Sequence, residues 1–211
     1  MYLHFCQAFV RMQSELIWTI FRKEGFTMKK ACIFLADGFE TIEGLTVVDV
    51  LRRAGIETWT VSVKESKNVV TSNGISLQAD KLFDEVDYDE MDILILPGGT
   101  VGTDNLNAHH GVKVLTEKFV REGKYVAAIC AAPGILGDMG LLRGKKAVCH
   151  PSRKAHLKDA LFIDEPAVCD GNIITGRAMA ASLEFALLIL EKLAGGDAVS
   201  LVNEGIVYRK E

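Results

Sequence analysis

The sequence lacks the cysteine pattern of a disulfide framework or of a zinc knuckle. It has five cysteines, an odd number, and no two of them form a Cys-x-x-Cys pair. Disulfides are rare in reducing compartments, so this cysteine usage favours a cytoplasmic protein with free thiols. The five positions are Cys6, Cys32, Cys130, Cys149 and Cys169.

Further absences argue against whole classes of partner. The net charge is −4 and no basic stripe occurs, so we expect no nucleic acid partner. Neither a P-loop nor a Gly-x-Gly-x-x-Gly sequence is present, which weakens the case for a phosphate-binding protein. The apolar run Leu16–Phe21 has six residues, against the roughly 20 that span a bilayer. No small-residue cleavage site comes after it, and we expect no membrane association.

The chain also lacks linkers, internal repeats and low-complexity segments. Its 211 residues, 49% hydrophobic and 25% charged, suit one globular domain with a full core. Residues 1–27 differ in character from the rest of the chain, and Met28-Lys29-Lys30 before an apolar run looks like a natural beginning. We therefore predict an N-terminal extension over residues 1–27, outside the core, and a single domain over residues 28–211.

The sequence does contain an alternation of apolar strands and helices. Nearly continuous apolar runs are typical of parallel strands that are covered on both faces. Alternation of such runs with helices predicts a doubly wound α/β sheet. The expected strands are Ala31–Ala36, Glu57–Val63, Asp92–Leu96, Tyr125–Ile129 and Ala147–His150, with short ones at 161–163, 167–169 and 173–175 and a hairpin over 69–77 around Asn73-Gly74. The expected helices are Glu43–Ala54 capped by Thr41, Gly111–Glu122, Ala131–Met139 and Ser182–Leu193 closed by Gly195-Gly196, with a short one at 198–203.

The stretch Tyr125–Gly134 has the layout of a nucleophile elbow. A buried strand ends at Cys130, a helix start with Pro133 comes next, and small residues, Ala128 and Ala132, lie two positions on either side. Such a turn exposes one side chain at the edge of the sheet, beside a helix N-terminus that favours thiolate over thiol. The competing interpretation is a buried cysteine that acts only as a small hydrophobic residue.

Two other strand ends should meet Cys130 at the carboxyl edge of the sheet. Glu43 comes after the first strand and is either a carboxylate that complements the helix dipole or a partner of the thiol. Glu40 is an equal rival for that role on spacing alone. Gly98-Gly99 is either a flexible loop or, with the N–H of Ala131, an oxyanion hole.

Other polar residues have weaker signals. His150 is either a satisfied histidine or an acid/base near the thiol, with a pKa suited to neutral pH. Arg177 forms a salt bridge to a loop or holds an anionic group. His109 and His110 are expected to be exposed and inert, and Cys32 to fill the core.

Taken together, these motifs resemble the ThiJ/PfpI superfamily, closest to its DJ-one branch. The resemblance covers Met28 to about Val207. The matching stretches are FLADGFETIE (Phe34–Glu43), VDVLRRAG (Val48–Gly55), LPGG (Leu96–Gly99), AAICAAP (Ala127–Pro133), His150-Pro151, TGR (Thr175–Arg177) and SLEFA (Ser182–Ala186).

The resemblance implies a flavodoxin-like sheet sandwiched by helices, of the class I glutamine amidotransferase-like type, and a homodimer. It implies that Cys130 is the reactive and easily oxidised thiol, that Glu43 rather than Glu40 is the protonated carboxyl touching it, and that His150 lies close by. Family members include cofactor-free glyoxalases, deglycases, redox-linked chaperones and proteases, and the family was once assigned to thiamine-precursor synthesis. The protease-like branch has His directly after the cysteine, whereas this chain has Ala131, so proteolysis is disfavoured.

The motifs support two hypotheses of different class. In the first, Cys130 attacks a small reactive aldehyde or oxoaldehyde without cofactor or metal, Gly98, Gly99 and Ala131 bind the oxyanion, and Glu43 and His150 move protons. In the second, the same thiol is a redox sensor in a stress protein or chaperone, oxidised to sulfenic or sulfinic acid.

Overall fold

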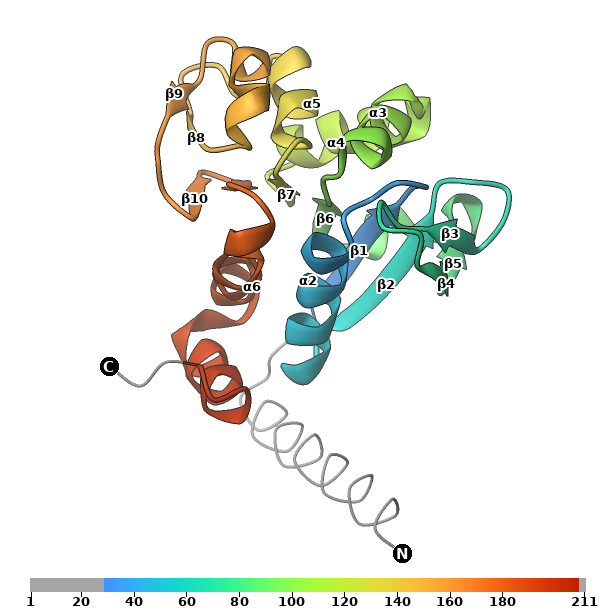
Figure 1. Ribbon diagram of the computed structural model, residues 1–211. Helices are drawn as coiled ribbons and strands as arrows, with labels where there is room; N and C mark the ends of the chain where they lie inside the picture. The colour runs from blue at the N-terminus through green and yellow to red at the C-terminus, as the bar shows by residue number, and fades with distance from the viewer. Residues whose placement is uncertain (1–28, 209–211) are drawn as a thin grey trace, which may run out of the picture.

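The apolar runs of the sequence form the middle of a seven-stranded sheet in the computed structural model, which describes residues 29–208 (Figure 1). The strand order is β10-β11-β7-β6-β1-β2-β5, and all neighbours are parallel except the edge pair β10–β11. The doubly wound α/β prediction is confirmed. The strands are β1 (Lys30–Leu35), β2 (Glu57–Ser62), β5 (Lys81–Leu82), β6 (Ile93–Leu96), β7 (Tyr125–Ile129), β10 (Ala167–Asp170) and β11 (Ile173–Gly176).

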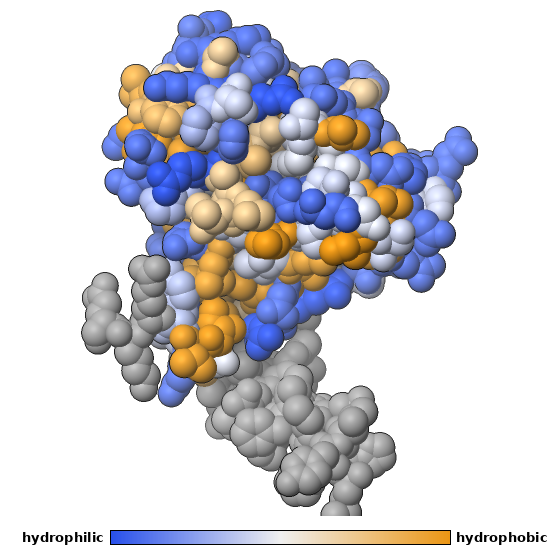
Figure 2. All heavy atoms as spheres, viewed as in Figure 1, coloured by the Kyte–Doolittle hydropathy of each residue, from blue (hydrophilic) through white to orange (hydrophobic). Residues whose placement is uncertain are grey.

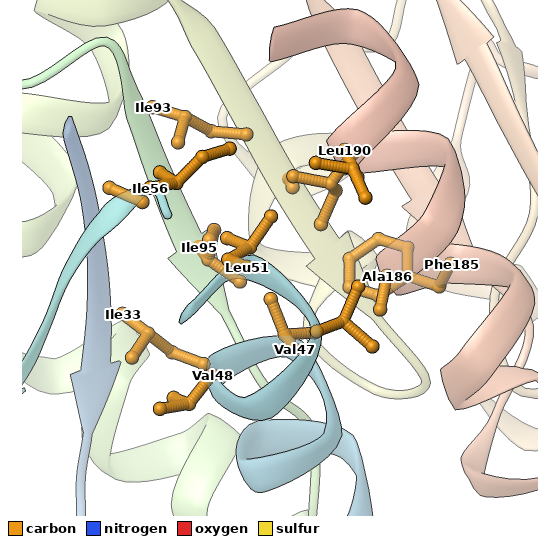
Figure 3. Close-up of a cluster of buried hydrophobic side chains, with 14 of the residues drawn as sticks. Ile33, Val47, Val48, Leu51, Ile56, Ile93, Ile95, Phe185, Ala186 and Leu190 are labelled. Carbon is orange, nitrogen blue, oxygen red and sulfur yellow. The ribbon is translucent and has the colours of Figure 1, made fainter. Parts of the chain in front are cut away.

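Helices cover both faces of this sheet because each central strand is apolar on both sides. In β1, Ile33 and Leu35 face α2 (Thr41–Arg53) and α6 (Ser182–Gly205), whereas Cys32 and Phe34 face the opposite layer. That second layer contains α3 (Thr100–Ala108), α4 (His110–Arg121) and α5 (Pro133–Asp138). Figure 3 shows the first core, a buried cluster that contains Leu51 of α2, Leu190 of α6 and Ile95 of β6.

The order of the strands positions the site. The chain passes from β1 outward to β2 and β5, then returns to β6 on the other side of β1. Connections therefore diverge between β1 and β6, and in open α/β sheets such a switch point leaves a crevice at the carboxyl ends of the strands. The loops after β1, β6 and β7 all end at this edge.

Two predicted details are confirmed. β3 (Asn68–Val70) and β4 (Ser76–Gln78) pair as an antiparallel hairpin, with Gly74 in its turn at a φ of +78°. The final helix breaks at Gly195, where φ is 83° and ψ is 174°, before a second helical segment.

Other details of the predicted elements were wrong. Thr41 is the first helical residue of α2 rather than its cap; Glu40 occupies the cap position. The strand predicted over Ala147–His150 is confined to β8 (Lys146–Ala147), which pairs with β9 (Leu161–Phe162) in a separate small sheet. The chain leaves it because the backbone of His150 hydrogen-bonds to Cys130 instead.

Several short elements were not predicted. α3 contains two asparagines and a glycine and has little intrinsic helix propensity. Four 3₁₀ turns are η1 (Phe83–Glu85), η2 (Tyr88–Glu90), η3 (Pro151–Leu157) and η4 (Met179–Ala181). The predicted extension over residues 1–27 lies outside the described residues and stays a prediction.

Candidate active site

Cys130 lies at a sharp turn directly after β7. Its φ is 64°, a left-handed conformation that costs a residue with a side chain about 1–3 kcal/mol. Two backbone hydrogen bonds hold the turn: the N–H of Cys130 donates to the carbonyl of Gly176 at 3.0 Å, and its carbonyl accepts from the N–H of His150 at 2.8 Å. Ala128 and Ala132 are fully buried beside it. This is the geometry of the predicted elbow.

The helix after the elbow is shorter than expected. α5 begins at Pro133 rather than Ala131 and has six residues, Pro133–Asp138. Residues 130–132 form the turn itself. A helix this short has a weak dipole, so its N-terminus stabilises a thiolate less than the longer predicted helix would.

Glu43 is the acidic group next to the thiol. It lies in the first turn of α2 and is fully buried. Its Oε2 accepts a hydrogen bond from the N–H of Gly98 at 2.9 Å. Among residues 29–208, its Oε1 has no hydrogen-bond partner of normal geometry, and the carboxyl also contacts the Cys130 thiol.

Gly98 fills the space between these two side chains. A Cβ on Gly98 would lie 2.5 Å from Oε2 of Glu43 and 2.6 Å from Cβ of Cys130. Any larger residue would separate the carboxyl from the thiol or displace one of them. The glycine is therefore required by close approach rather than by loop flexibility.

Glu40, the rival carboxylate, has a different environment. Its side chain accepts a hydrogen bond from Oγ of Ser72 at 2.9 Å, and its N–H donates to the carbonyl of Gly98 at 3.0 Å. Its carboxylate is thus turned to the β3–β4 hairpin, and Glu43 is the acid placed beside the sulfur. Sequence spacing could not distinguish them because both lie within one turn of the start of α2.

The electrostatics of the pair are set by burial. Burial raises the pKa of Glu43 to about 7, against hydrogen bonds from Cys130 and Gly98 that lower it. Burial, and then the charge of Glu43, raise the pKa of the Cys130 thiol to about 12. The backbone N–H groups of Gly99 and Ala131 act on the sulfur in the opposite direction and lower its pKa.

These shifts make the predicted thiolate depend on the protonation of Glu43. Two negative charges side by side in a buried site are unfavourable, so the pair retains at least one proton at neutral pH. A thiolate requires that this proton reside on Glu43, where the carboxyl becomes a hydrogen-bond donor to the sulfur.

Gly99 connects the loop after β6 to the loop after β1. Its φ is +86°, and a Cβ there would lie 2.8 Å from the N atom of Glu40. Both Gly99 and Ala131 direct their N–H groups at the sulfur of Cys130. Of the three residues predicted to form an oxyanion hole, Gly99 and Ala131 therefore converge on one point, whereas the N–H of Gly98 donates to Oε2 of Glu43 instead.

The sulfur opens into a pocket of about 720 Å³. The hairpin, the loops after β1, β6 and β7, and the turns η3 and η4 form its walls. Figure 2 shows the face in Figure 1, where apolar groups extend from the middle toward the lower left and polar side chains predominate above them and at the right. The lining residues are Gly38, Glu40, Glu43, Thr71, Ser72, Asn73, Gly99, Thr100, Val101, Cys130, Ala131, His150, Ser152, Arg153, Ala178, Met179 and Ala180.

His150 lines this pocket and caps η3. Its Nδ1 accepts from the N–H of Ser152 at 3.2 Å and lies 2.7 Å from Ser152 Oγ. With Nδ1 engaged as an acceptor, the neutral ring carries its proton on Nε2. His109, expected to be exposed, is half-buried: its Nδ1 caps α4 by accepting from Val112 N–H at 3.2 Å.

Arg177 does not join this group. It is absent from the pocket lining, and its guanidinium forms a 3.0 Å ion pair with Asp164. Of the two alternatives for Arg177, the structure contains the salt bridge to a loop. The chain enters the pocket wall only at the next residue, Ala178.

Sequence reasoning missed Arg153 and the hairpin residues Ser72 and Asn73. Arg153 lies on η3, three residues after His150. Its closeness in sequence to a predicted site histidine could have indicated that it lines the pocket. The hairpin residues had no such signal, because only the folded chain brings them over the elbow. Among residues 29–208 no group of His, Cys, Asp and Glu is arranged to hold a metal ion, and no helix there is long and apolar enough to span a membrane.

Comparison with known proteins identifies the family. The model of the DJ-1/PfpI family matches residues 29–192. This chain belongs to the DJ-1/PfpI family. Protein dj-1beta of Drosophila melanogaster is 35% identical over 181 residues, which is 85% of this chain and 97% of that protein. The crystal structure of Drosophila melanogaster DJ-1beta has a TM-score of 0.83 at 34% identity, covering 87% of this chain and all of that one. The flavodoxin-like prediction is confirmed.

Other DJ-1/PfpI relatives differ in length and in name. Protein DJ-1 homolog B of Arabidopsis thaliana is 37% identical over 162 residues, so the chain spans only 37% of that relative's length. A Thermococcus kodakarensis protein named Deglycase TK1284 is 34% identical over 70% of this chain and 89% of its own. A Schizosaccharomyces pombe protein named Glutathione-independent glyoxalase DJ-1 is 29% identical over 85% of this chain and 98% of its own.

Proposed function

We propose that this DJ-1/PfpI protein is a cofactor-free enzyme that converts small reactive carbonyls, α-oxoaldehydes above all, through covalent addition to Cys130. The observation that carries the proposal is the convergence of three groups on one sulfur. The buried carboxyl of Glu43 adjoins the thiol, and the amides of Gly99 and Ala131 point at it. The names of the Thermococcus and Schizosaccharomyces relatives describe deglycase and glyoxalase activity.

The chemistry begins with the addition of the sulfur to the aldehyde carbon. The C–S bond forms, the carbonyl π bond opens onto oxygen, and the proton shared by Glu43 and Cys130 neutralises the alkoxide to give a hemithioacetal. The N–H groups of Gly99 and Ala131 hold that oxygen while it is charged. Both amides already lie at the sulfur, and the oxygen forms one carbon away from it.

Isomerisation and hydrolysis complete the reaction. Glu43, now a carboxylate, takes the proton from the former aldehyde carbon, which gives an enediolate, and returns it to the neighbouring ketone carbon, while the hydroxyl proton of the hemithioacetal moves to the former ketone oxygen. This internal transfer oxidises the first carbon to a thioester and reduces the second to an alcohol. Water then cleaves the thioester to a 2-hydroxy acid and restores the thiol. His150 assists through Nε2, because Nδ1 is engaged with Ser152.

Turnover of methylglyoxal to lactate tests the proposal. Cys130→Ser should abolish turnover, and Glu43→Gln should lower kcat about 10²- to 10⁴-fold, the usual contribution of a general acid–base. Cys169→Ser is the matched control, since Cys169 lies in β10 outside the pocket lining and should retain full activity. Wild-type rates in Cys130→Ser or Glu43→Gln would contradict the mechanism.

A redox role for the same thiol is the second candidate. The sulfur opens into the pocket, and the donors at Gly99, Ala131 and protonated Glu43 suit an oxidised sulfur oxygen as well as a substrate oxygen. A relative of 29% identity and TM-score 0.82 is titled Toxoplasma gondii DJ-1, oxidized. Mass spectrometry after mild peroxide, run beside the methylglyoxal assay, separates the two roles. Two added oxygens on Cys130 without turnover would favour the sensor.

We also propose a homodimer in the cytoplasm. Exposed apolar side chains lie on α2, the hairpin, α3 and η4, elements that also contribute residues to the pocket lining, which suits contact with a second copy. Light scattering should give twice the mass of one chain, and Ile42→Glu should shift it toward the monomer. The apolar residues are Ile42, Leu45, Val70, Ile75, Val101 and Met179. The free cysteines at 32, 130, 149 and 169 suit a reducing compartment.

A further inference from the structure

Among residues 29–208, Arg153 is the only lysine or arginine in the lining of the pocket that holds Cys130. Its side chain is 23% exposed, whereas that of Arg143, earlier in the chain, is 79% exposed. A guanidinium in the wall of a pocket is a strong local positive charge. The thiol chemistry needs an acid and two amides, and it does not use this charge.

Two consecutive backbone hydrogen bonds hold Arg153 relative to the sulfur. The N–H of Arg153 donates to the carbonyl of His150 at 2.8 Å, and the N–H of His150 donates to the carbonyl of Cys130 at 2.8 Å. The base of the Arg153 side chain is therefore connected to the elbow through ordered main chain. A ligand bound to both groups would be held in one orientation.

The guanidinium has donors to spare. Its one ion pair within residues 29–208 is with Asp104, at 3.6 Å between Nη2 and Oδ1, which is beyond hydrogen-bond distance. The side chain of Asp104 is 64% exposed and so is largely hydrated. A guanidinium has five N–H donors arranged to bind a carboxylate through two parallel hydrogen bonds, and none of the described hydrogen bonds uses them.

We propose that Arg153 binds a carboxylate of the substrate, so that the preferred substrate is an α-oxoaldehyde with a carboxylate at the end away from the aldehyde. This rests on the proposed function and extends it to a substrate class. A carboxylate suits the site better than a phosphate dianion, because Glu40 and Glu43 line the same pocket and Asp104 already shares the guanidinium.

The reaction itself is unchanged for such a substrate. With 4,5-dioxovalerate, the sulfur adds to the aldehyde carbon, the hydrogen moves from that carbon to the ketone carbon, and water releases 2-hydroxyglutarate. Water is the only co-reactant. The remote carboxylate takes no part in bond making, and its contact with Arg153 only positions the aldehyde.

The test compares kcat/KM for methylglyoxal and 4,5-dioxovalerate in the wild type and three variants. Arg153→Gln should lower the value for 4,5-dioxovalerate about 10- to 100-fold, as expected for the loss of hydrogen bonds to a charged group, and change that for methylglyoxal less than about 3-fold. Asp104→Asn should raise the value for 4,5-dioxovalerate, because it frees the guanidinium. Arg143→Gln, the control, should change neither.

The opposite signs expected for Arg153→Gln and Asp104→Asn separate this role from a structural one. If the ion pair only clamps η3 to α3, both variants should weaken turnover of both substrates alike, and the proposal is wrong. If the wild type converts neither compound, the proposed function fails and calorimetry decides the role of Arg153. Tighter binding of 2-hydroxyglutarate than of lactate, lost in Arg153→Gln, supports the proposal, and equal binding overturns it.

Discussion

Glu43→Gln should stabilise this protein at alkaline pH, although it removes a residue of the candidate active site. Glu43 is fully buried, and its pKa of about 7 lies well above its ordinary value of 4.5. Between these two pH values the folded chain holds a proton that the unfolded chain has released. The free energy of unfolding therefore falls as the pH rises through this window.

The size of the effect depends on the two pKa values. At about 1.4 kcal/mol for each pH unit between 4.5 and about 7, ionisation of Glu43 costs up to about 3 kcal/mol at pH 8. Glutamine is neutral at every pH. Its Oε1 can accept the hydrogen bond from Gly98 N–H, and its amide can donate to the sulfur as a protonated carboxyl would.

Urea unfolding monitored by circular dichroism at pH 4 and pH 8 checks this prediction, at one protein concentration throughout. Glu43→Gln should match the wild type at pH 4 and exceed its free energy of unfolding by up to about 3 kcal/mol at pH 8. Glu40→Gln is the matched control, because that carboxylate hydrogen-bonds to Ser72 at the surface. A variant less stable than the wild type at pH 8 would refute the assignment of Glu43 as a buried, destabilising charge.

Two further outcomes are expected at the same site. Removing the carboxylate of Glu43 should lower the pKa of Cys130, because the charge of Glu43 contributes to the rise of that pKa to about 12. A titration of thiolate absorbance near 240 nm against pH measures the pKa of Cys130. An unchanged midpoint in Glu43→Gln would contradict this prediction. Gly98→Ala should abolish turnover and destabilise the fold, because its Cβ would lie 2.5 Å from Glu43 Oε2. Gly196→Ala should do neither, because an added Cβ there would contact none of residues 29–208 beyond its own stretch of helix. Activity assays and urea unfolding compare the two variants.

The architecture was predictable because burial on both faces leaves a strong pattern. Runs such as Ile33–Leu35 and Ile93–Leu96 are apolar at every position, and each alternate residue enters a different core. The elbow was predictable for a similar reason, since small residues two positions either side of Cys130 are a steric requirement. Both signals are local in the sequence.

The features that could not be predicted depend on contacts between distant segments. The thiol pKa depends on how completely Cys130 and Glu43 are desolvated, and the residues next to them in the sequence do not determine this desolvation. α3 forms despite weak propensity because Leu106 is buried against the second core. Arg177 pairs with Asp164, thirteen residues away, and no spacing rule would have separated that partner from a bound anion.

The β3–β4 hairpin contributes no strand to the seven-stranded sheet, yet it forms part of the pocket wall. The N–H of Gly38 donates to the carbonyl of Val70 at 2.7 Å, and the N–H of Ser72 donates to the carbonyl of Phe39 at 2.8 Å. Because the hairpin lies outside the seven-stranded sheet, its turn can change in length or composition without altering the register of any central strand. Substitutions or insertions in this turn can thus change the access of ligands to the sulfur while the central sheet stays the same.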